Sequence, residues 1–226
     1  MERIVRFGST RILFDADAPE APTTEWFDPD WWIALEAVTD QFGGRGKALA
    51  IETPAGPAVL RRYLRGGMMR HVNRDRYWFA GADTTRPFAE WRVTRKLHRA
   101  GLPVPEPLAA AFERYGPFYR AALLTHRISD ARPLPELATR LQPDGWSRIG
   151  AMLRRFAEAG LRHPDINATN ILVDDAGSPW LLDFDRARIV EGSFNVGPML
   201  GRLQRSLAKL GIAYDAAALR SADGSS

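Results

Sequence analysis

The 226-residue sequence contains no cysteine, which excludes disulfide bonds, thiolate zinc sites and cysteine nucleophiles. Its four histidines are scattered and are a poor basis for a dedicated metal cage, so any metal is expected to have oxygen ligands. Lysine is also scarce, because only Lys47, Lys96 and Lys209 are present and nearly all positive charge is carried by arginine. Arginine forks suit phosphate and carboxylate partners, although a GC-rich genome would explain the same composition.

Long hydrophobic stretches are missing as well. The chain has no run of about 18 apolar residues, and residues 1–14 lack the apolar region and small-residue cleavage site of a signal peptide. We therefore expect the protein to work in the cytoplasm. With 45% hydrophobic residues, the chain can bury a real core, and its length predicts one compact domain with room for two lobes.

The amino-terminal half is predicted to form a small antiparallel sheet with one helix across it. Strands are expected on either side of turn signals rich in glycine and proline, and the helix has Pro87 in its first turn and Gly101 just past its end. A second, short helix is expected after Asp28 and Pro29, which suit the N-cap and first helical position. The predicted strands are 3–7, 11–14, 48–52, 58–63, 108–112 and 118–125, and the predicted helices are 31–40 and 85–100.

The carboxy-terminal half carries the motif with chemical content. After a helix predicted over 144–160, residues 163–185 read H-x-D-x-x-x-x-N, strand, turn, strand, D-F-x. Phosphoryl transfer requires an acid that accepts the proton of the attacking hydroxyl and oxygen ligands that hold Mg²⁺ against the phosphates. Asp165 suits the first role, Asn170 and Asp183 suit the second, and His163 would brace the loop.

The spacing supports this interpretation, because a hairpin between Asn170 and Asp183 returns the chain so that both can face one metal site. A single aspartate is usually a turn or cap residue, and H-x-D alone occurs often by chance. The complete pattern, with a helix before it and a hairpin inside it, is far more specific.

A kinase of this kind also needs a cover for the phosphates and a cation paired with a carboxylate. Gly43, Gly44 and Gly46 are candidates for the cover, although an ordinary loop is an equally good interpretation. Arg61 occupies the place of the lysine in a V-A-I-K strand, and Glu90 on the next helix is its natural partner, unless Glu90 is only a favourable charge at the start of a helix. The alternative cations are Arg62, one register step away, and Lys47.

Together these pieces resemble the 3-deoxy-D-manno-octulosonic acid (Kdo) kinases, in the lipopolysaccharide-core kinase group of the protein-kinase-like superfamily. The resemblance covers about residues 43 to 190. Its motifs are residues 60–67 (LRRYLRGG), 85–87 (TRP) with Glu90, 101–105 (GLPVP), 119–121 (YRA), the catalytic stretch and 183–186 (DFDR).

The resemblance implies an α+β, protein-kinase-like bilobal fold, with the small sheet and one helix in an N-lobe at about 1–125. A reduced, mainly helical C-lobe would follow at about 126–220. The composition of residues 221–226 itself predicts a disordered tail. The resemblance also implies ATP and Mg²⁺ as cofactors and transfer of the γ-phosphate to the 4-hydroxyl of Kdo on the lipid A precursor Kdo-lipid IVA, with Asp165 as the active-site aspartate. Such a protein would sit peripherally on the cytoplasmic side of the bacterial inner membrane.

The chain departs from protein kinases in three ways. Asp185 stands where D-F-G has glycine, as in the Kdo kinases, and no A-P-E sequence follows, so regulation through an activation segment is not expected. Arg61 replaces lysine, which leaves the identity of the phosphate-binding cation open.

Basic and aromatic residues gather between Arg61 and Arg76, a composition that suits an anionic glycolipid at a membrane surface. RNA would suit the same composition but lacks a fold signature here, so no nucleic-acid partner is expected, and a solvated loop is a further alternative. Arg186 and Arg188 could meet an anionic group of the acceptor or form internal ion pairs. Trp31 and Trp32 are expected in the core rather than at a membrane interface.

Two other functions remain open from the sequence. A heptose kinase, an antibiotic phosphotransferase or a small protein kinase would use the same catalytic residues on another acceptor. A pseudokinase would bind nucleotide without turnover, although the joint presence of Asp165, Asn170 and Asp183 argues against it. The oligomeric state is not indicated by the sequence.

Overall fold

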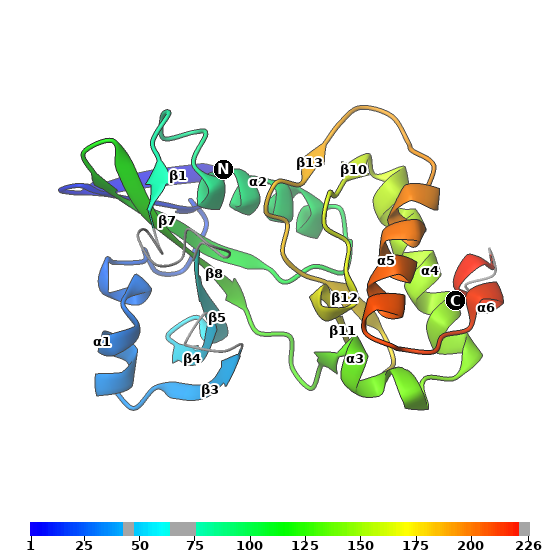
Figure 1. The fold of residues 1–226 in the computed structure, drawn as a ribbon. Coiled ribbons are helices and arrows are strands. Elements are labelled where there is room, and N and C mark those ends of the chain that lie inside the picture. Colours follow the sequence, from blue (N-terminus) through cyan, green and yellow to red (C-terminus); the bar gives the residue numbers. More distant parts are fainter. Residues whose placement is uncertain (43–47, 64–75, 222–226) are drawn as a thin grey trace. The chain divides into compact units, whose positions relative to one another are not determined.

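The computed structural model of the protein describes residues 1–42, 48–63 and 76–221. Its contacts divide the chain into two compact units: unit 1 contains Met1–Arg92 and Glu106–Arg127, and unit 2 contains Val93–Pro105 and Ile128–Ser226 (Figure 1). The predicted phosphate cover, Gly43, Gly44 and Gly46, lies outside the described residues, as do Lys47 and most of the basic stretch before Arg76. No described helix is both long and apolar enough to cross a membrane.

The described part of unit 1 is built on one antiparallel sheet in the order β1-β2-β7-β8-β5-β4-β3, with β6 paired to β8. Tight turns join β1 to β2, β4 to β5 and β7 to β8, as the sequence predicted. The strands are β1 (Glu2–Phe7), β2 (Thr10–Asp15), β3 (Val38–Phe42), β4 (Ala48–Thr53), β5 (Gly56–Arg62), β6 (Tyr77–Trp78), β7 (Pro107–Tyr115) and β8 (Phe118–His126).

Alternating side chains give this sheet two buried faces. One face packs against Phe88 and Trp91 of helix α2 (Arg86–Arg99), which begins in unit 1 and continues into unit 2. The other face packs against Trp26 of the 3₁₀ turn η1 (Glu25–Phe27) and Trp32 of α1 (Pro29–Ala34). The expectation of core tryptophans is confirmed, because Trp32 is 2% exposed and the half-buried Trp31 packs on it.

The helix predicted over residues 31–40 is wrong beyond Ala34. Helix α1 begins as predicted, with Pro29 in its first turn and the Asp28 side chain accepting a hydrogen bond from the Asp30 N–H. It ends before Glu36, whose φ of 54° is left-handed, and residues 38–42 then form β3 against β4. Pairing with β4 satisfies the backbone groups of this segment, and that long-range interaction overrides its local helical pattern.

Unit 2 combines helices with two small antiparallel sheets. One sheet pairs β10 (Leu161–Arg162) with β13 (Arg188–Ile189), and the other has the order β12-β11-β9. The remaining elements are β9 (Arg132–Pro133), α3 (Leu134–Leu137), η3 (Ala138–Arg140), α4 (Pro143–Glu158), η4 (Ala168–Asn170), β11 (Ile171–Val173), β12 (Pro179–Leu181), α5 (Gly197–Lys209) and α6 (Ala216–Arg220).

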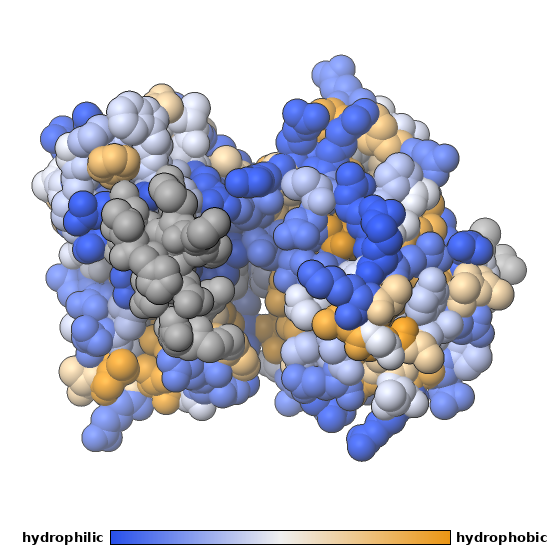
Figure 2. All heavy atoms as spheres, viewed as in Figure 1, coloured by the Kyte–Doolittle hydropathy of each residue, from blue (hydrophilic) through white to orange (hydrophobic). Residues whose placement is uncertain are grey.

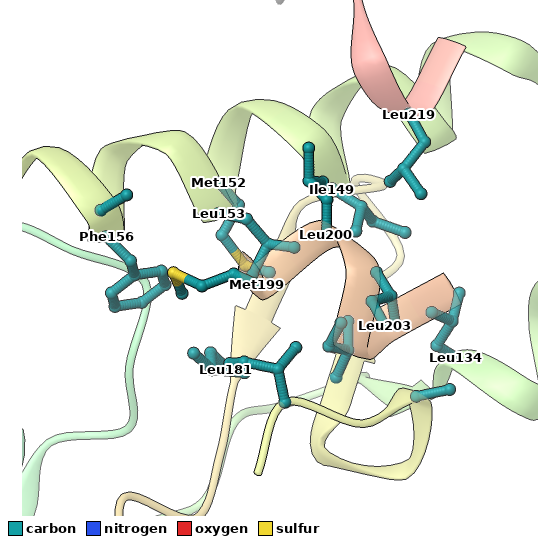
Figure 3. Packing of buried hydrophobic residues seen from close by; sticks show 14 of the residues in the cluster. Leu134, Ile149, Met152, Leu153, Phe156, Leu181, Met199, Leu200, Leu203 and Leu219 are labelled. Atoms are coloured by element: carbon teal, nitrogen blue, oxygen red, sulfur yellow. The ribbon is translucent and has the colours of Figure 1, made fainter. Parts of the chain in front are cut away.

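The core of unit 2 forms where the apolar faces of α4 and α5 meet the β11–β12 hairpin. Leu153 and Phe156 of α4 lie beside Leu203 of α5 and Leu181 of β12, and all four are fully buried (Figure 3). Leu219 of α6 closes the cluster beside α4. This packing fixes the H-x-D-x-x-x-x-N stretch, because Ile166 and Ala168 within it, and Leu161 and Ile171 on either side of it, belong to the same core.

A close backbone approach and a set of hydrogen bonds hold α6 and the residue after it against α4. A Cβ on Gly150 of α4 would lie 2.1 Å from the Leu219 carbonyl oxygen of α6, so only glycine lets these helices touch there. Ser221 follows α6 and is tied down through its N–H, which donates to the Ala217 carbonyl, while the Arg154 guanidinium donates to the carbonyl of Ser221. Residues 222–226 lie outside the described part of the chain.

Candidate active site

The H-x-D-x-x-x-x-N stretch runs from β10 through a turn and the 3₁₀ turn η4 into β11. Asn167 organises this turn, because its side-chain oxygen accepts hydrogen bonds from the Asn170 N–H at 3.1 Å and from the Thr169 hydroxyl at 2.5 Å. The Ala168 N–H donates to the Ser206 hydroxyl of α5 at 3.0 Å. These bonds link the loop both to itself and to the helical core, so its backbone is held in one conformation.

His163 lies beneath the loop and is 3% exposed. Its Nδ1 accepts a hydrogen bond from the Asp165 N–H at 3.1 Å, and its ring packs 5.5 Å from that of Phe184. Burial lowers the pKa of His163, and this outweighs the opposite effects of the Asp183 backbone and the Asp183 and Asp165 carboxylates. The imidazole is therefore neutral near pH 7, with Nδ1 free to accept this bond. The structure thus places His163 against the loop that it was predicted to brace, and that role stays a prediction.

Asp165 has its backbone anchored and its side chain exposed. Among the described residues, nothing forms a hydrogen bond or an ion pair with its carboxylate. An aspartate that serves only as a cap or turn residue would use its oxygens on nearby backbone N–H groups, as Asn167 does here. The backbone of Asp165 is thus held in place by a hydrogen bond, and its exposed carboxylate can contact a bound molecule.

Asn170 and Asp183 lie at the open end of the β11–β12 hairpin, as their spacing predicted. Asn170 immediately precedes β11, and Asp183 lies two residues beyond β12. The strands pair Ile171 with Leu181, and the Leu182 N–H donates to the Asn170 carbonyl at 2.8 Å. This register brings the two predicted metal ligands to the same end of one hairpin.

The backbone at Asp183 is itself unusual, because its φ of 61° is left-handed for a residue that is not glycine. Such a conformation costs on the order of 1 kcal/mol and persists only where its surroundings enforce it, most often at functional sites. Here Phe184 supplies the constraint: it is 1% exposed, and its ring packs between His163 and Phe156. The buried Phe184 ring therefore lies against His163, which holds the loop of Asp165, and directly follows Asp183 in the chain.

The chemistry of this pair fits a magnesium ion bound together with phosphates. Among the described residues, no cluster of three or more histidine and carboxylate side chains could form an all-protein metal cage. Mg²⁺ usually takes one or two protein oxygens and completes its shell with water and substrate phosphates. One amide oxygen from Asn170 and one carboxylate from Asp183 match that requirement.

Unit 1 contains the ion pair that the sequence suggested between Arg61 and Glu90. Arg61 Nη2 lies 2.5 Å from Glu90 Oε1, and the Glu90 side chain is 2% exposed. Tyr63, which sequence reasoning missed, donates a hydrogen bond from its hydroxyl to the other Glu90 oxygen. Its ring also stacks under the Arg61 guanidinium at 4.9 Å, so both oxygens of the buried carboxylate are satisfied.

Strand register explains why Arg61 rather than Arg62 pairs with Glu90. Successive side chains of β5 point to opposite faces, so Arg61 shares a face with Tyr63, which packs in the cluster of helix α2. Leu60 and Arg62 project to the other face, where Leu60 contacts the tryptophan cluster. The pattern i, i+2 at Arg61 and Tyr63 was the signal that could have identified Tyr63 from the sequence.

Comparison with known proteins shows the family of the chain. The family model described as "Lipopolysaccharide kinase (Kdo/WaaP) family" matches residues 29–221. The chain belongs to this lipopolysaccharide kinase family. It is therefore a phosphotransferase, and the resemblance inferred from its motifs is confirmed.

Individual relatives cover most of the chain. It is 45% identical over 207 residues to the "3-deoxy-D-manno-octulosonic acid kinase" of Xanthomonas oryzae pv. oryzae strain PXO99A, covering 90% of this chain and 82% of the relative. Proteins with the same name from Stenotrophomonas maltophilia strain R551-3 and Xylella fastidiosa strain 9a5c are 44% and 43% identical. These matches cover 90% and 88% of this chain, and 82% and 80% of the respective relatives.

This kinase also has a cavity of about 460 Å³ within unit 2, which we call the arginine pocket. Its charged lining residues are Arg162, Arg186, Arg188 and Arg202, and no aspartate or glutamate of the described residues lines it. Only Arg186 and Arg188 were singled out from the sequence, and their alternative role in internal ion pairs is wrong for the described residues, where neither makes one. Arg162 and Arg202 were missed because they join this cavity only through strand pairing and helix packing.

The predicted site residues thus fall into three sets. His163, Asp165, Asn170 and Asp183 come together in unit 2 around the hairpin and Phe184. Arg61 and Glu90 meet in unit 1. Gly43, Gly44 and Gly46 lie outside the described residues, and their role stays a prediction.

Proposed function

We propose that this kinase transfers the γ-phosphate of ATP to the 4-hydroxyl of Kdo on Kdo-lipid IVA, the lipid A precursor. The observation that carries the proposal is the unpartnered Asp165 carboxylate on a loop braced by His163, in a chain whose relatives are named Kdo kinases. The acceptor is taken from those names and from the resemblance of the motifs. The transfer chemistry is taken from the residues.

In the proposed reaction, Asp165 holds the acceptor hydroxyl and accepts its proton as the oxygen attacks the γ-phosphorus. A new phosphorus–oxygen bond forms, the bond between the γ-phosphorus and the β–γ bridging oxygen breaks, and ADP leaves. His163 positions Asp165, because its Nδ1 accepts a hydrogen bond from the Asp165 backbone N–H. His163 does not take the proton of the acceptor hydroxyl. Because burial lowers the pKa of His163, its imidazole stays neutral beside the loop of Asp165.

Asn170 and Asp183 are proposed to hold Mg²⁺, which when bound neutralises charge on the phosphates. Arg61 is proposed to be the phosphate-binding cation, with Lys47 and Arg62 as the alternatives. Its pairing with Glu90 and Tyr63 supports this choice, because a guanidinium fixed on one side keeps its remaining N–H groups in a defined direction. Gly43, Gly44 and Gly46 remain the candidates for a phosphate cover.

We further propose that the protein works peripherally at the cytoplasmic face of the inner membrane, where a lipid-linked acceptor would be found. Support comes from one end of the sheet in unit 1, where the turns of β1–β2 and β7–β8 lie side by side and the Arg114 N–H donates to the Ser9 carbonyl at 3.1 Å. Three large side chains at this end are well exposed: Phe7 at 45%, Trp78 at 66% and Tyr115 at 37%.

Arginines surround this end of the sheet and suit an anionic surface. The Arg114 and Arg120 guanidiniums lie over the rings of Phe79 and Tyr115 at 4.6 and 5.1 Å, respectively. Flotation with vesicles containing anionic lipid would test this location: Trp78→Ser should weaken binding, whereas the same change at Trp180, half-buried in unit 2, serves as a control. Equal binding of all three proteins would rule out a contribution from this surface.

The function is tested by mass spectrometry of Kdo-lipid IVA after incubation with the purified protein, Mg²⁺ and ATP. We expect a mass gain of one phosphate, its loss on chelation with EDTA, and a fragment that places the phosphate on the 4-hydroxyl of Kdo. Asp165→Ala alongside shows whether the transfer depends on the proposed base. If the protein binds Mg²⁺–ATP but leaves this acceptor unmodified, the acceptor is wrong, and heptose-bearing core oligosaccharide, an aminoglycoside and a protein substrate are the next acceptors to try. A pseudokinase would modify none of them.

A further inference from the structure

The arginine pocket is the feature of unit 2 that the transfer chemistry does not use. Its wall includes His163 and Pro164, so it adjoins the backbone that leads directly into Asp165. A cavity of about 460 Å³ falls within the range of small-molecule sites, about 300–1,000 Å³. Figure 2 shows strongly hydrophilic residues gathered over the part of unit 2 where β13 and α5 lie.

The charges in this pocket repel one another. Arg162 of β10 and Arg188 of β13 are direct partners in the antiparallel pairing of these strands. Like charges at directly opposed positions destabilise a sheet. Arg186, two residues before Arg188, and Arg202 on α5 add two more positive charges to the same lining.

Within the described ranges, no carboxylate is paired with these arginines. In the part of the chain that the structure describes, none of the four guanidiniums forms an ion pair with a carboxylate. Arginines elsewhere in the molecule do so, as Arg92 does with Glu2 and Asp83, and Arg148 with Asp144. The pocket thus gathers four guanidiniums, none of which is held in an ion pair by a carboxylate of the described residues.

Specific contacts within unit 2 hold the lining of the pocket in place. The Arg162 guanidinium stacks on the Phe194 ring at 4.1 Å, and the Phe194 N–H donates to the Ala157 carbonyl at the end of α4. Arg202 Nη1 donates to the Pro198 carbonyl at 3.2 Å. Gly160 lets this loop approach α4, because a Cβ there would lie 2.1 Å from the Val190 carbonyl oxygen. These contacts hold two of the four cations in position before any ligand arrives.

We propose that the arginine pocket binds an anionic group of the acceptor, a carboxylate or a phosphate, and so orients the sugar whose hydroxyl faces Asp165. Planar guanidinium forks suit both oxyanions, and a bound anion would relieve the repulsion between Arg162 and Arg188. This inference rests on the proposed function for the identity of the acceptor. The binding of an oxyanion in the pocket does not depend on it.

The kinetic test compares Arg188→Gln and Arg202→Gln with Arg205→Gln, a matched change at an exposed α5 arginine that does not line the pocket. Loss of one charged hydrogen-bonding group should raise KM for Kdo-lipid IVA by about tenfold or more in each pocket variant. KM for ATP should not change in any of the three. Unchanged KM for the acceptor in both pocket variants would overturn the inference.

A binding test without ATP separates this inference from the proposed function. The thermal midpoint of the intact protein is measured with the methyl glycoside of Kdo, which carries a carboxylate and no phosphate, and with N-acetylglucosamine 1-phosphate, which carries a phosphate and no carboxylate. A ligand that binds the folded state raises this midpoint. We expect a rise with at least one probe for the unmodified protein and for Arg205→Gln, and none for the double variant of Arg188 and Arg202.

The outcomes of the two tests can be told apart. A rise with the sugar acid alone assigns the pocket to the carboxylate, and a rise with the sugar phosphate alone assigns it to the phosphate. If either rise occurs through these arginines while Kdo-lipid IVA is not phosphorylated, the pocket stands and the proposed acceptor fails. If the acceptor is phosphorylated but neither probe raises the midpoint and acceptor KM is unaffected by the variants, the pocket assignment fails and the kinase function stands.

Discussion

Arginine plays opposite parts in the two units of this protein. In unit 1, Arg61 lies 2.5 Å from a buried carboxylate that the fold itself provides, and Tyr63 completes that arrangement. In unit 2, four arginines line one cavity, and no acid of the described part of the chain is among its lining residues. The difference teaches that an arginine-rich composition has no single meaning, because the surrounding fold decides whether each cation is already compensated.

The energetic reason lies in solvent exposure. Glu90 is 2% exposed, and a carboxylate removed from water costs several kcal/mol unless it is paired and hydrogen-bonded. Arg186 and Arg188 are exposed, so their guanidiniums stay hydrated and repel one another only weakly while the pocket is empty. A buried pair must therefore be complete at all times, whereas a solvated cluster of like charges can persist until an anion binds.

The largest effect is expected on catalysis, at Asp165, which belongs to neither arginine site. Asp165→Ala should lower kcat by about 10²–10⁴-fold, because it removes the proton acceptor, while ATP binding and the unfolding midpoint stay nearly unchanged. Steady-state kinetics and calorimetry with ATP measure the two effects. Asp175→Ala, at an exposed position between β11 and β12, is the matched control. Near-normal turnover by Asp165→Ala would contradict the mechanism.

The contrast between the two arginine sites predicts that Arg61 is needed for stability. Arg61→Gln should lower the free energy of unfolding by about 2–3 kcal/mol, less than the ~3–5 of a fully buried pair because the Arg61 side chain is 28% exposed. Urea unfolding of the variant beside the unmodified protein gives this value. A loss below about 0.5 kcal/mol, the size expected for a surface ion pair, would show that Glu90 does not need its cation.

A smaller effect tests whether Tyr63 is part of the same arrangement. Tyr63→Phe removes only the hydroxyl that donates to Glu90 and should cost about 1.5–2 kcal/mol, as expected for a hydrogen bond to a charged group. Tyr214→Phe is a suitable control, since that half-buried ring packs on Trp146 in unit 2. Combining Tyr63→Phe with Arg61→Gln sharpens the result, because two residues that share one carboxylate should not contribute additively.

The smallest change in the free energy of unfolding is expected for an arginine of the pocket in unit 2. Arg188→Gln should leave the free energy of unfolding unchanged or raise it by about 0.2–0.5 kcal/mol at low salt, since it removes the like charge opposite Arg162. Added salt should diminish any gain through screening. Urea unfolding at two salt concentrations measures both effects. A loss as large as that of Arg61→Gln would mean that Arg188 has a structural role, and the contrast between the two units would disappear.

Local patterns were sufficient for most of the secondary structure. Glycine turns between alternating segments predicted the hairpins, and Pro87 and Gly101 marked the two ends of α2 closely. The same local reasoning extended α1 through residues 35–40, where pairing of β3 with β4 takes over. Helix α5 was not predicted at all, although its buried residues Leu200, Leu203 and Leu207 recur at helical spacing.

The candidate site was predictable to different degrees for the same reason. His163, Asp165, Asn170 and Asp183 lie within 21 residues, so one loop and one hairpin suffice to bring them together. Arg61 and Glu90 are 29 positions apart, and their pairing was inferred only because a strand and the next helix commonly carry such a pair. The hydrogen bond from Tyr63 to Glu90 was not predicted, because it depends on which face of the sheet packs against α2.

By itself, the sequence determined the reaction class, since the spacing of its acids and amides within one short stretch admits few chemistries other than phosphoryl transfer. Only the tertiary structure decided which arginines are compensated and which are not. Ion pairs depend on distances of a few ångströms between side chains, and strand register and helix packing set those distances. Arg162 and Arg188 became neighbours when β10 paired with β13, and Arg202 joined them when α5 packed on the core.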